Sequence, residues 1–94
     1  MNEQDNIIFV GDKAFMNYVT AIVMQFTTKN ATQVMVKSRG KFISKAVDVC
    51  EVAVKRFLKA TIAVKHISID SETFTNQEGK EVRVSVIEIL LHKV

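Results

Sequence analysis

The hydrophobic pattern of this chain changes its period at one glycine, Gly40. Before it, residues 33–38 alternate between apolar and polar side chains, which is typical of a half-buried strand. After it, apolar side chains recur every three or four positions, which is typical of a helix; they are Ile43, Val47, Cys50, Val54 and Phe57. A strand must therefore pass directly into a helix here, which favours folds built from strand–helix crossovers.

Positive charge concentrates at the same turn. Residues 37–45 carry four cations, which are Lys37, Arg39, Lys41 and Lys45. The first N–H groups of a helix lack backbone partners and attract anions, so a basic turn before a helix suits a phosphate group. A turn whose charges are only solvated is the alternative interpretation.

The remaining pattern predicts further elements on both sides of this turn. They are strands at 6–10, 33–38, 61–75 and 81–92, helices at 14–29 and 41–58, and a hairpin loop at 76–79. Asp12 suits the start of the first helix as a cap or dipole partner. Alternation in the third strand puts Val64 on one face and Ile67 with Ile69 on the other. The last strand is apolar on both sides from 86 to 91, so we expect it to be central in its sheet.

The order β-α-β-α-β-β predicts a two-layer α+β fold in one domain, residues 1–94. A mixed four-stranded sheet would carry two helices on one face and a long projecting hairpin between residues 61 and 92. The first three strands should share a direction. The glycines 11, 40 and 79 follow these strands, each beside a cation: Lys13, Arg39 with Lys41, and Lys80. We expect the three turns to form one basic rim.

The composition favours a polyanionic partner and a second copy of the chain. Residues 29–65 hold nine basic side chains against two acids, whereas acids outnumber bases in the rest. The chain is 48% hydrophobic and has no proline, which is much apolar material for 94 residues. We therefore predict a homodimer. A single cysteine, no signal-like start and no long apolar run indicate a reducing, cytoplasmic location without membrane association.

Catalysis has little support in the sequence. His66 and His92 are far apart, Cys50 lies on an apolar helical face, and Asp48 and Glu51 occupy an outer helical face. Neither metal-ligand spacing nor a phosphate-binding loop of the Walker type is present. We expect no enzyme, no catalytic residues, no metal and no cofactor.

Four segments of the chain are the most distinctive: residues 11–19 (GDKAFMNYV), 37–48 (KSRGKFISKAVD), 56–58 (RFL) and 78–85 (EGKEVRVS). They resemble the Alba family, the small dimeric nucleic-acid-binding chromatin proteins of archaea. The resemblance runs from residue 6 to residue 93. It implies a chromosome-associated homodimer that binds double-stranded DNA, and often RNA, with little sequence preference.

The resemblance also implies roles for particular residues. The nucleic-acid-binding residues that it implies are Lys13, Arg39, Lys41, Lys80 and Arg83, and the basic turn adds Lys37, Gly40 and Lys45 as candidates. Lys13 is the candidate for reversible acetylation by an acetylase and deacetylase, and Phe57 with Leu58 for contacts between dimers on DNA. Two departures stand out, because Asp12 replaces one lysine of a pair and Phe42 replaces a usually small residue. Phe42 could be core, or it could stack on an unpaired base near the rim.

Two other functions stay open at this point. One is an RNA-binding subunit of a ribonucleoprotein, such as a tRNA-processing particle. The other is a protein–protein adaptor whose apolar faces bind partners and whose charge gives solubility. Salt separates the adaptor from both nucleic-acid functions, because only phosphate-driven binding weakens steeply as salt rises.

Overall fold

The structure is a computed structural model that describes residues 6–94. Its elements are β1 (Ile7–Val10), α1 (Phe15–Thr27), β2 (Gln33–Arg39), a 3₁₀ turn (Gly40–Phe42), α2 (Ile43–Val52), a π-helical turn (Ala53–Phe57), β3 (Ile62–Thr75) and β4 (Glu81–Lys93). This order confirms the predicted β-α-β-α-β-β arrangement. Asn30, the residue that follows the predicted helix 14–29, adopts a left-handed conformation with φ of 56° just beyond α1.

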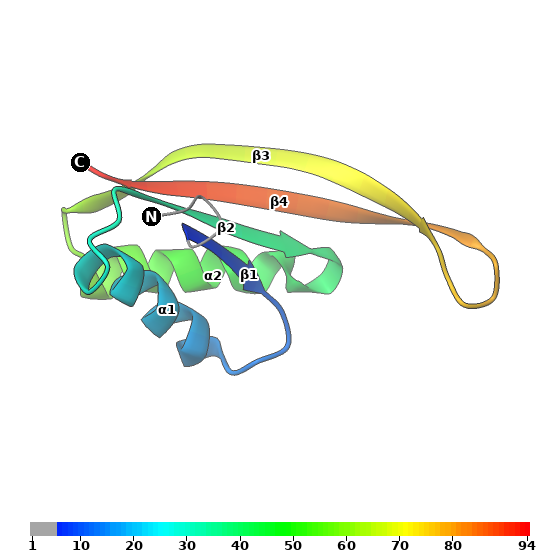
Figure 1. Cartoon of the computed structure of the whole chain (residues 1–94), viewed down its shortest axis with the longest axis horizontal. Coiled ribbons are helices and arrows are strands. Elements are labelled where there is room, and N and C mark those ends of the chain that lie inside the picture. The colour runs from blue at the N-terminus through cyan, green and yellow to red at the C-terminus, as the bar shows by residue number, and fades with distance from the viewer. Residues whose placement is uncertain (1–5) are drawn as a thin grey trace.

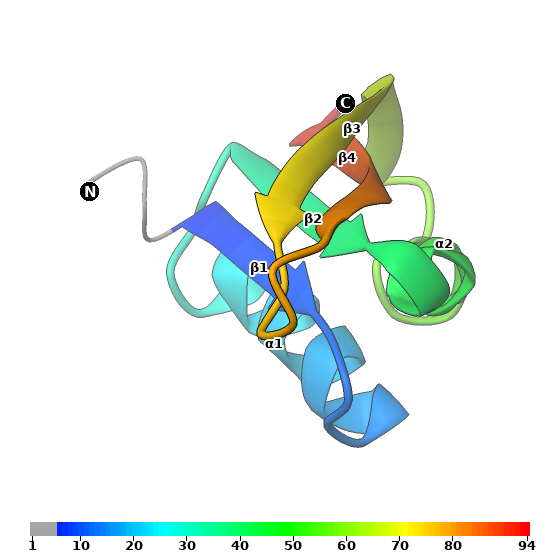
Figure 2. The ribbon, with the colours of Figure 1, turned by 90° about the vertical axis from the view of Figure 1, so that its right-hand side faces the viewer.

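The four strands form one mixed sheet in the order β1-β2-β4-β3. β1 and β2 are parallel, and β4 pairs antiparallel with β2 and with β3. The first three strands therefore share a direction, and β4 is central, as its apolar sequence predicts. Both helices cover the same face of the sheet (Figure 1), and the end-on view in Figure 2 shows the two layers. The largest fully buried side chains between these layers are Ile22, Leu91, Val19, Val34, Val36 and Val49.

The β3–β4 hairpin projects beyond the rest of the sheet. β2 ends where Arg39 pairs with Val86, so residues 71–75 and 81–85 pair only with each other. This two-stranded segment, with its loop, is called the arm below; it gives the molecule its longest extent of 46 Å (Figure 1). Inside the loop, Asn76 Oδ1 accepts hydrogen bonds from the N–H groups of Glu78 and Lys80, both at 3.0 Å.

A β-bulge corrects the predicted faces of β3. The register shifts between Val64 and His66, so Val64 pairs with Leu91 while Ile67 pairs with Ile89. Both partners are buried on the helix-covered face, and directly paired residues share a face. Val64 and Ile67 therefore lie on the same face, whereas strict alternation predicted opposite faces. The extra residue of the bulge, Lys65, changes the parity.

The sequence predicted one regular helix at residues 41–58. The structure instead has a 3₁₀ turn, α2 and a π-helical turn in succession. In the last turn the N–H of Leu58 donates to the carbonyl of Ala53 over 3.0 Å, a π-type bond that spans one more residue than an α-helical bond. The added residue brings Leu58 into the core, where it is 6% exposed, and turns Phe57 outward, 53% exposed. Leu58 therefore has little surface for a contact between dimers, and of this pair only Phe57 offers a side chain.

The buried stripe of α2 includes Val49 where the apolar repeat of the sequence favoured Val47. It consists of Ala46, Val49, Cys50 and the following Ala53. Val47, predicted to be internal, is 42% exposed. Both choices of stripe fit helical spacing, because Val47 and Val49 are each three or four residues from other apolar positions. Only the position of the sheet decides between them.

Candidate nucleic-acid interface

The turns after β1 and β2 meet at the carboxyl ends of these parallel strands. Val10, the last residue of β1, pairs with Ser38, the residue before the end of β2, and the Ser38 hydroxyl donates to the Val10 carbonyl at 2.9 Å. Gly40 begins the second turn with a φ of +58°, and a Cβ there would lie 3.2 Å from Val84 Cγ2. A larger residue would combine an unfavourable positive φ with this close approach, so glycine is the residue that fits here. Gly40 thus acts by allowing the chain to turn into α2.

Tyr18 and Lys45 both bind the backbone of the first turn, Tyr18 through the N–H groups of the turn and Lys45 through its carbonyl groups. The Tyr18 hydroxyl oxygen accepts hydrogen bonds from the N–H groups of Gly11 and Lys13, each at 3.0 Å. Lys45 Nζ donates to the carbonyls of the same two residues, with 2.7 Å to the Gly11 oxygen. We call this arrangement the Tyr18–Lys45 latch. It occupies the backbone N–H groups of Gly11 and Lys13, so these two groups are not available to an anion.

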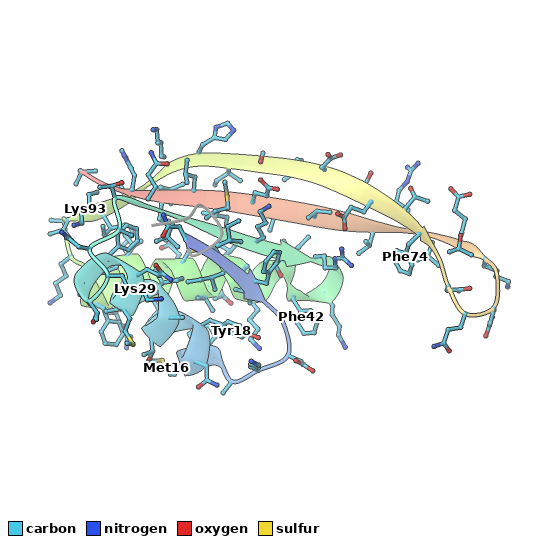
Figure 3. The ribbon with its side chains drawn as sticks, in the orientation of Figure 1. Met16, Tyr18, Lys29, Phe42, Phe74 and Lys93 are labelled. Atoms are coloured by element: carbon cyan, nitrogen blue, oxygen red, sulfur yellow. The ribbon has the colours of Figure 1, made fainter. Side chains whose placement is uncertain are left out.

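The latch gives Lys45 a role that the sequence did not predict. Its ammonium lies 5.2 Å from the centroid of the Tyr18 ring and 5.9 Å from that of Phe42. Figure 3 shows Tyr18 on α1 and Phe42 near the start of α2. Lys45 is half-buried. It connects the first turn to α2, and its charge is largely committed to this connection.

Asp12 and Lys13 point out of the first turn, and both are exposed. The prediction that Asp12 caps α1 is wrong, because Ala14 occupies the N-cap position and no side chain bonds to that end. Lys41 is exposed in the second turn, with its ammonium 5.3 Å from the Phe42 ring centroid. Among residues 6–94, neither Lys13 nor Lys41 is in an ion pair. These two ammonium groups are the ones that the two turns present to solvent.

Lys37 and Arg39 have acidic partners that sequence reasoning missed. Lys37 Nζ lies 3.5 Å from a Glu88 carboxylate oxygen, and the Arg39 guanidinium donates to Glu72 at the base of the arm. The Arg39 and Glu72 side chains are 60% and 51% exposed, so water screens their attraction. A phosphate can replace such a carboxylate. Both pairs depend on strand register, which the sequence alone does not give.

The third basic turn does not join the other two. Lys80 lies in the loop at the tip of the arm, and Arg83 lies on β4 within the arm; both are exposed. β2 ends beside Val86 of β4, and β4 begins five residues earlier at Glu81. Five residues of strand span roughly 17 Å. The predicted single rim of three turns is therefore two turns plus a separate arm (Figure 1). We call the two turns, residues 11–13 and 39–42, the basic rim.

The basic middle of the sequence is divided in space. Lys55 and Arg56 lie at the far end of the second helix, followed by Lys59 and Lys65. Fifteen residues of helix between Lys41 and Arg56 correspond to roughly 22 Å. Lys29 also lies at the end of the molecule opposite the arm (Figure 3). Less than half of the basic segment can therefore contact one ligand at the rim.

The single cysteine, Cys50, is buried in the core. Burial raises the pKa of the Cys50 thiol from 9.0 to about 12, with a smaller contribution from the Glu51 charge, so this thiol stays protonated near neutral pH. Within residues 6–94, no group of three or more His, Cys, Asp or Glu side chains is placed to hold a metal ion. None of the helices in this part of the chain combines the length and hydrophobicity needed to cross a membrane.

This architecture defines a class: a small two-layer α+β domain with basic turns at one sheet edge and a long projecting hairpin. The sequence profile of the family described as Alba matches residues 6–71, and the chain belongs to that family. Relatives include the "DNA/RNA-binding protein Alba" of Methanococcus maripaludis, 47% identical over 95% of this chain and 99% of the relative. The protein of the same name in Methanothrix thermoacetophila is 48% identical over 96% of this chain and 98% of the relative.

Solved structures agree with the family assignment. Alba from Thermoplasma volcanium superposes with a TM-score of 0.84 at 47% identity, covering 93% of this chain and 99% of that one. ALBA1 from Trypanosoma brucei superposes with a TM-score of 0.74 at 22% identity, covering 96% of this chain and 70% of the other. The second likeness shows the fold alone.

Proposed function

We propose that this protein, as one unit of residues 1–94, is an architectural protein that binds double-stranded DNA, and RNA, through phosphate contacts with little sequence specificity. The observation that carries the proposal is the basic rim, where the latch fixes the backbone and leaves the ammonium groups of Lys13 and Lys41 facing solvent. The names of the archaeal relatives, DNA/RNA-binding protein Alba, support the same conclusion. Binding rather than catalysis is the proposed activity.

The mechanism is neutralisation of phosphates by side-chain charge. Each phosphate contact releases condensed counterions, so the logarithm of the affinity falls with the logarithm of salt concentration by about 0.9 per contact on duplex DNA. Lys13 and Lys41 make such contacts without losing an ion pair. Lys37 and Arg39 must give up a carboxylate to bind a phosphate, so each of their contacts adds less binding free energy than a contact from Lys13 or Lys41. Lys80 and Arg83 extend the contacts along the arm. Phosphate contacts carry no base information, so specificity is low.

A homodimer would double this footprint, and the uncovered part of the core face is its proposed interface. Ile67 and Ile69 lie on the helix-covered face of β3 yet are 54% and 81% exposed, because neither helix covers them. Val64 continues this surface at 44% exposed, and Val47 is exposed on α2. We call these four residues the uncovered strip. A second copy that covers them would gain a free energy of roughly 25 cal/mol for each Å² of apolar surface that it buries.

Two finer features belong to the same proposal. Phe57, 53% exposed at the end of the second helix, would contact a neighbouring dimer on DNA. Lys13 is exposed and would be the site of reversible acetylation. An acetylase would remove the charge that binds phosphate, and a deacetylase would restore it. Both features suit a cytoplasmic protein associated with the chromosome.

Binding to duplex DNA, duplex RNA and single strands of equal length, each at several salt concentrations, tests the function. We expect affinity for both duplexes to fall steeply with salt and to depend little on sequence. Binding that barely responds to salt would support a protein–protein adaptor. Strong preference for one folded RNA over all duplexes would support a ribonucleoprotein subunit instead.

A further inference from the structure

A recess beside the basic rim combines aromatic rings with paired charges. It has a volume of about 380 Å³ and is lined by Phe9, Phe42, Lys37, Arg39, Glu72 and Glu88, among others. We call it the Phe9 recess. Its volume lies within the range of about 300–1,000 Å³ typical of small-molecule sites. It opens on the face of the sheet away from the helices, because Phe9 pairs with Lys37, and Lys37 with Glu88, on that face.

The chemistry of the recess suits a flat, partly polar group. Phe9 is 68% exposed, so most of its ring is free to contact a ligand. The Lys37 ammonium lies 6.0 Å from the ring centroid and 3.5 Å from Glu88. The acids and bases of the recess neutralise each other in two pairs, so it attracts a phosphate less than the rim does. A carboxylate that accepts hydrogen bonds recognises the amino and ring N–H groups of a base edge.

We propose that the Phe9 recess binds one unpaired nucleobase, with guanine preferred, while the rim holds the adjacent backbone. This rests on the proposed nucleic-acid binding. Phe9 stacks on the base, and Glu88 accepts hydrogen bonds from the guanine N1–H and amino groups. The recess is continuous with the rim, because Gly11 and Arg39 also line it. Paired bases inside a duplex cannot enter it. The protein thus distinguishes bulged or looped strands from perfect duplexes.

Three RNA duplexes of one sequence test this: a perfect duplex, one with a single unpaired guanine, and one with a single unpaired uridine. At one fixed salt concentration, we expect the guanine bulge to bind roughly 5- to 100-fold more tightly than the perfect duplex. Phe9→Ala and Phe9→Leu should bring that ratio close to one and leave perfect-duplex affinity and melting temperature unchanged. Glu88→Gln should reduce the preference for guanine over uridine. DNA duplexes with the same bulges show whether the sugar matters.

Phe57→Ala is the matched control, since Phe57 is a similarly exposed phenylalanine outside the recess, and it should keep the ratio. A bulge preference that survives both Phe9 substitutions overturns the proposal. So does a change in self-association caused by Phe9→Ala, because Phe9 would then contact another copy of the protein. Salt-insensitive binding of the perfect duplex would refute the proposed function instead. The ratio of bulged-duplex to perfect-duplex affinity is measured at one salt concentration, so the two failures can be told apart.

Discussion

At the scale of single residues, neighbouring cations make different contacts that charge alone does not reveal. Lys41 is exposed at the rim, while Lys45, four residues later, donates to two carbonyls of the latch. The sequence predicted the same binding role for both. It could not have separated them, because the partners of Lys45 lie more than thirty residues away in the chain.

Substitutions at these two lysines should therefore have opposite signatures. Lys41→Ala should weaken binding to all duplexes equally, flatten the salt slope by about one, and leave the melting temperature unchanged. Lys45→Met removes the donor of the latch and should lower the free energy of unfolding by about 1–2 kcal/mol, or the melting temperature by roughly 4–15 °C. Salt titrations and thermal melts distinguish them. Equal stability of both variants would show that the latch does not stabilise the fold.

Asp12 is the residue whose charge most directly opposes the proposed function. It is exposed beside Lys13, and no side chain caps the helix that follows. Asp12→Lys should tighten duplex binding and steepen the salt slope by about one or two, through lost repulsion and a new contact. Stability should change by less than about 0.5 kcal/mol, because no cap bond is lost. Glu51→Lys, with the same change in net charge on α2, is the control and should have a smaller effect on affinity.

At the scale of elements, the sequence predicted order, type and topology correctly, because apolar periods and turn residues are local signals. It failed where one residue changes the period. The bulge at Lys65 and the π turn at Ala53–Phe57 each add a residue, and everything beyond changes face. The apolar residues Ile62, Val64, Ile67 and Ile69 do carry a signal for the bulge, since their parity switches between Val64 and Ile67. The π turn has no comparable signal.

The ion pair between Arg39 and Glu72 joins the rim to the arm, and its release should favour binding. Glu72→Gln leaves Arg39 free for phosphate, so duplex affinity should rise roughly two- to five-fold, the worth of an exposed pair. Asp70→Asn removes the same charge from the same face of β3 and should have little effect. The gain should vanish when Arg39→Ala is already present, which a double-mutant cycle measures. A gain that persists there would assign it to net charge.

The arm itself buries little, so it can be shortened without unfolding the protein. Its residues from 71 to 75 are all exposed. Replacing residues 76–80 with Asn-Gly should keep the melting temperature within a few degrees, because two-residue turns of this type suit hairpins. Affinity should fall and the footprint on DNA, measured by nuclease protection, should shorten. A footprint of unchanged length would show that the arm does not contact DNA.

At the scale of the whole molecule, the two faces of the sheet have different proposed partners. The helix-covered face continues as the uncovered strip, which is apolar, whereas the opposite face holds the Phe9 recess with its paired charges. A partner chain on the first face leaves the second free for nucleic acid. This division also accounts for the high apolar fraction of the sequence, since part of it lies outside the protomer's own core.

The dimer can be tested with two substitutions that differ only in the face they alter. Ile69 is 81% exposed and Phe9 is 68% exposed, so aspartate at either position should leave the protomer folded. Ile69→Asp should reduce the mass measured by light scattering from about twice the 10.6 kDa of one chain to a single chain, because a buried charge without a partner opposes association. The salt slope of DNA binding should fall by about half, since it counts phosphate contacts. Phe9→Asp should remain dimeric. If Ile69→Asp stays dimeric while Phe9→Asp dissociates, the dimer interface lies on the face that holds the Phe9 recess. The assignment of the two faces to their partners would then be wrong.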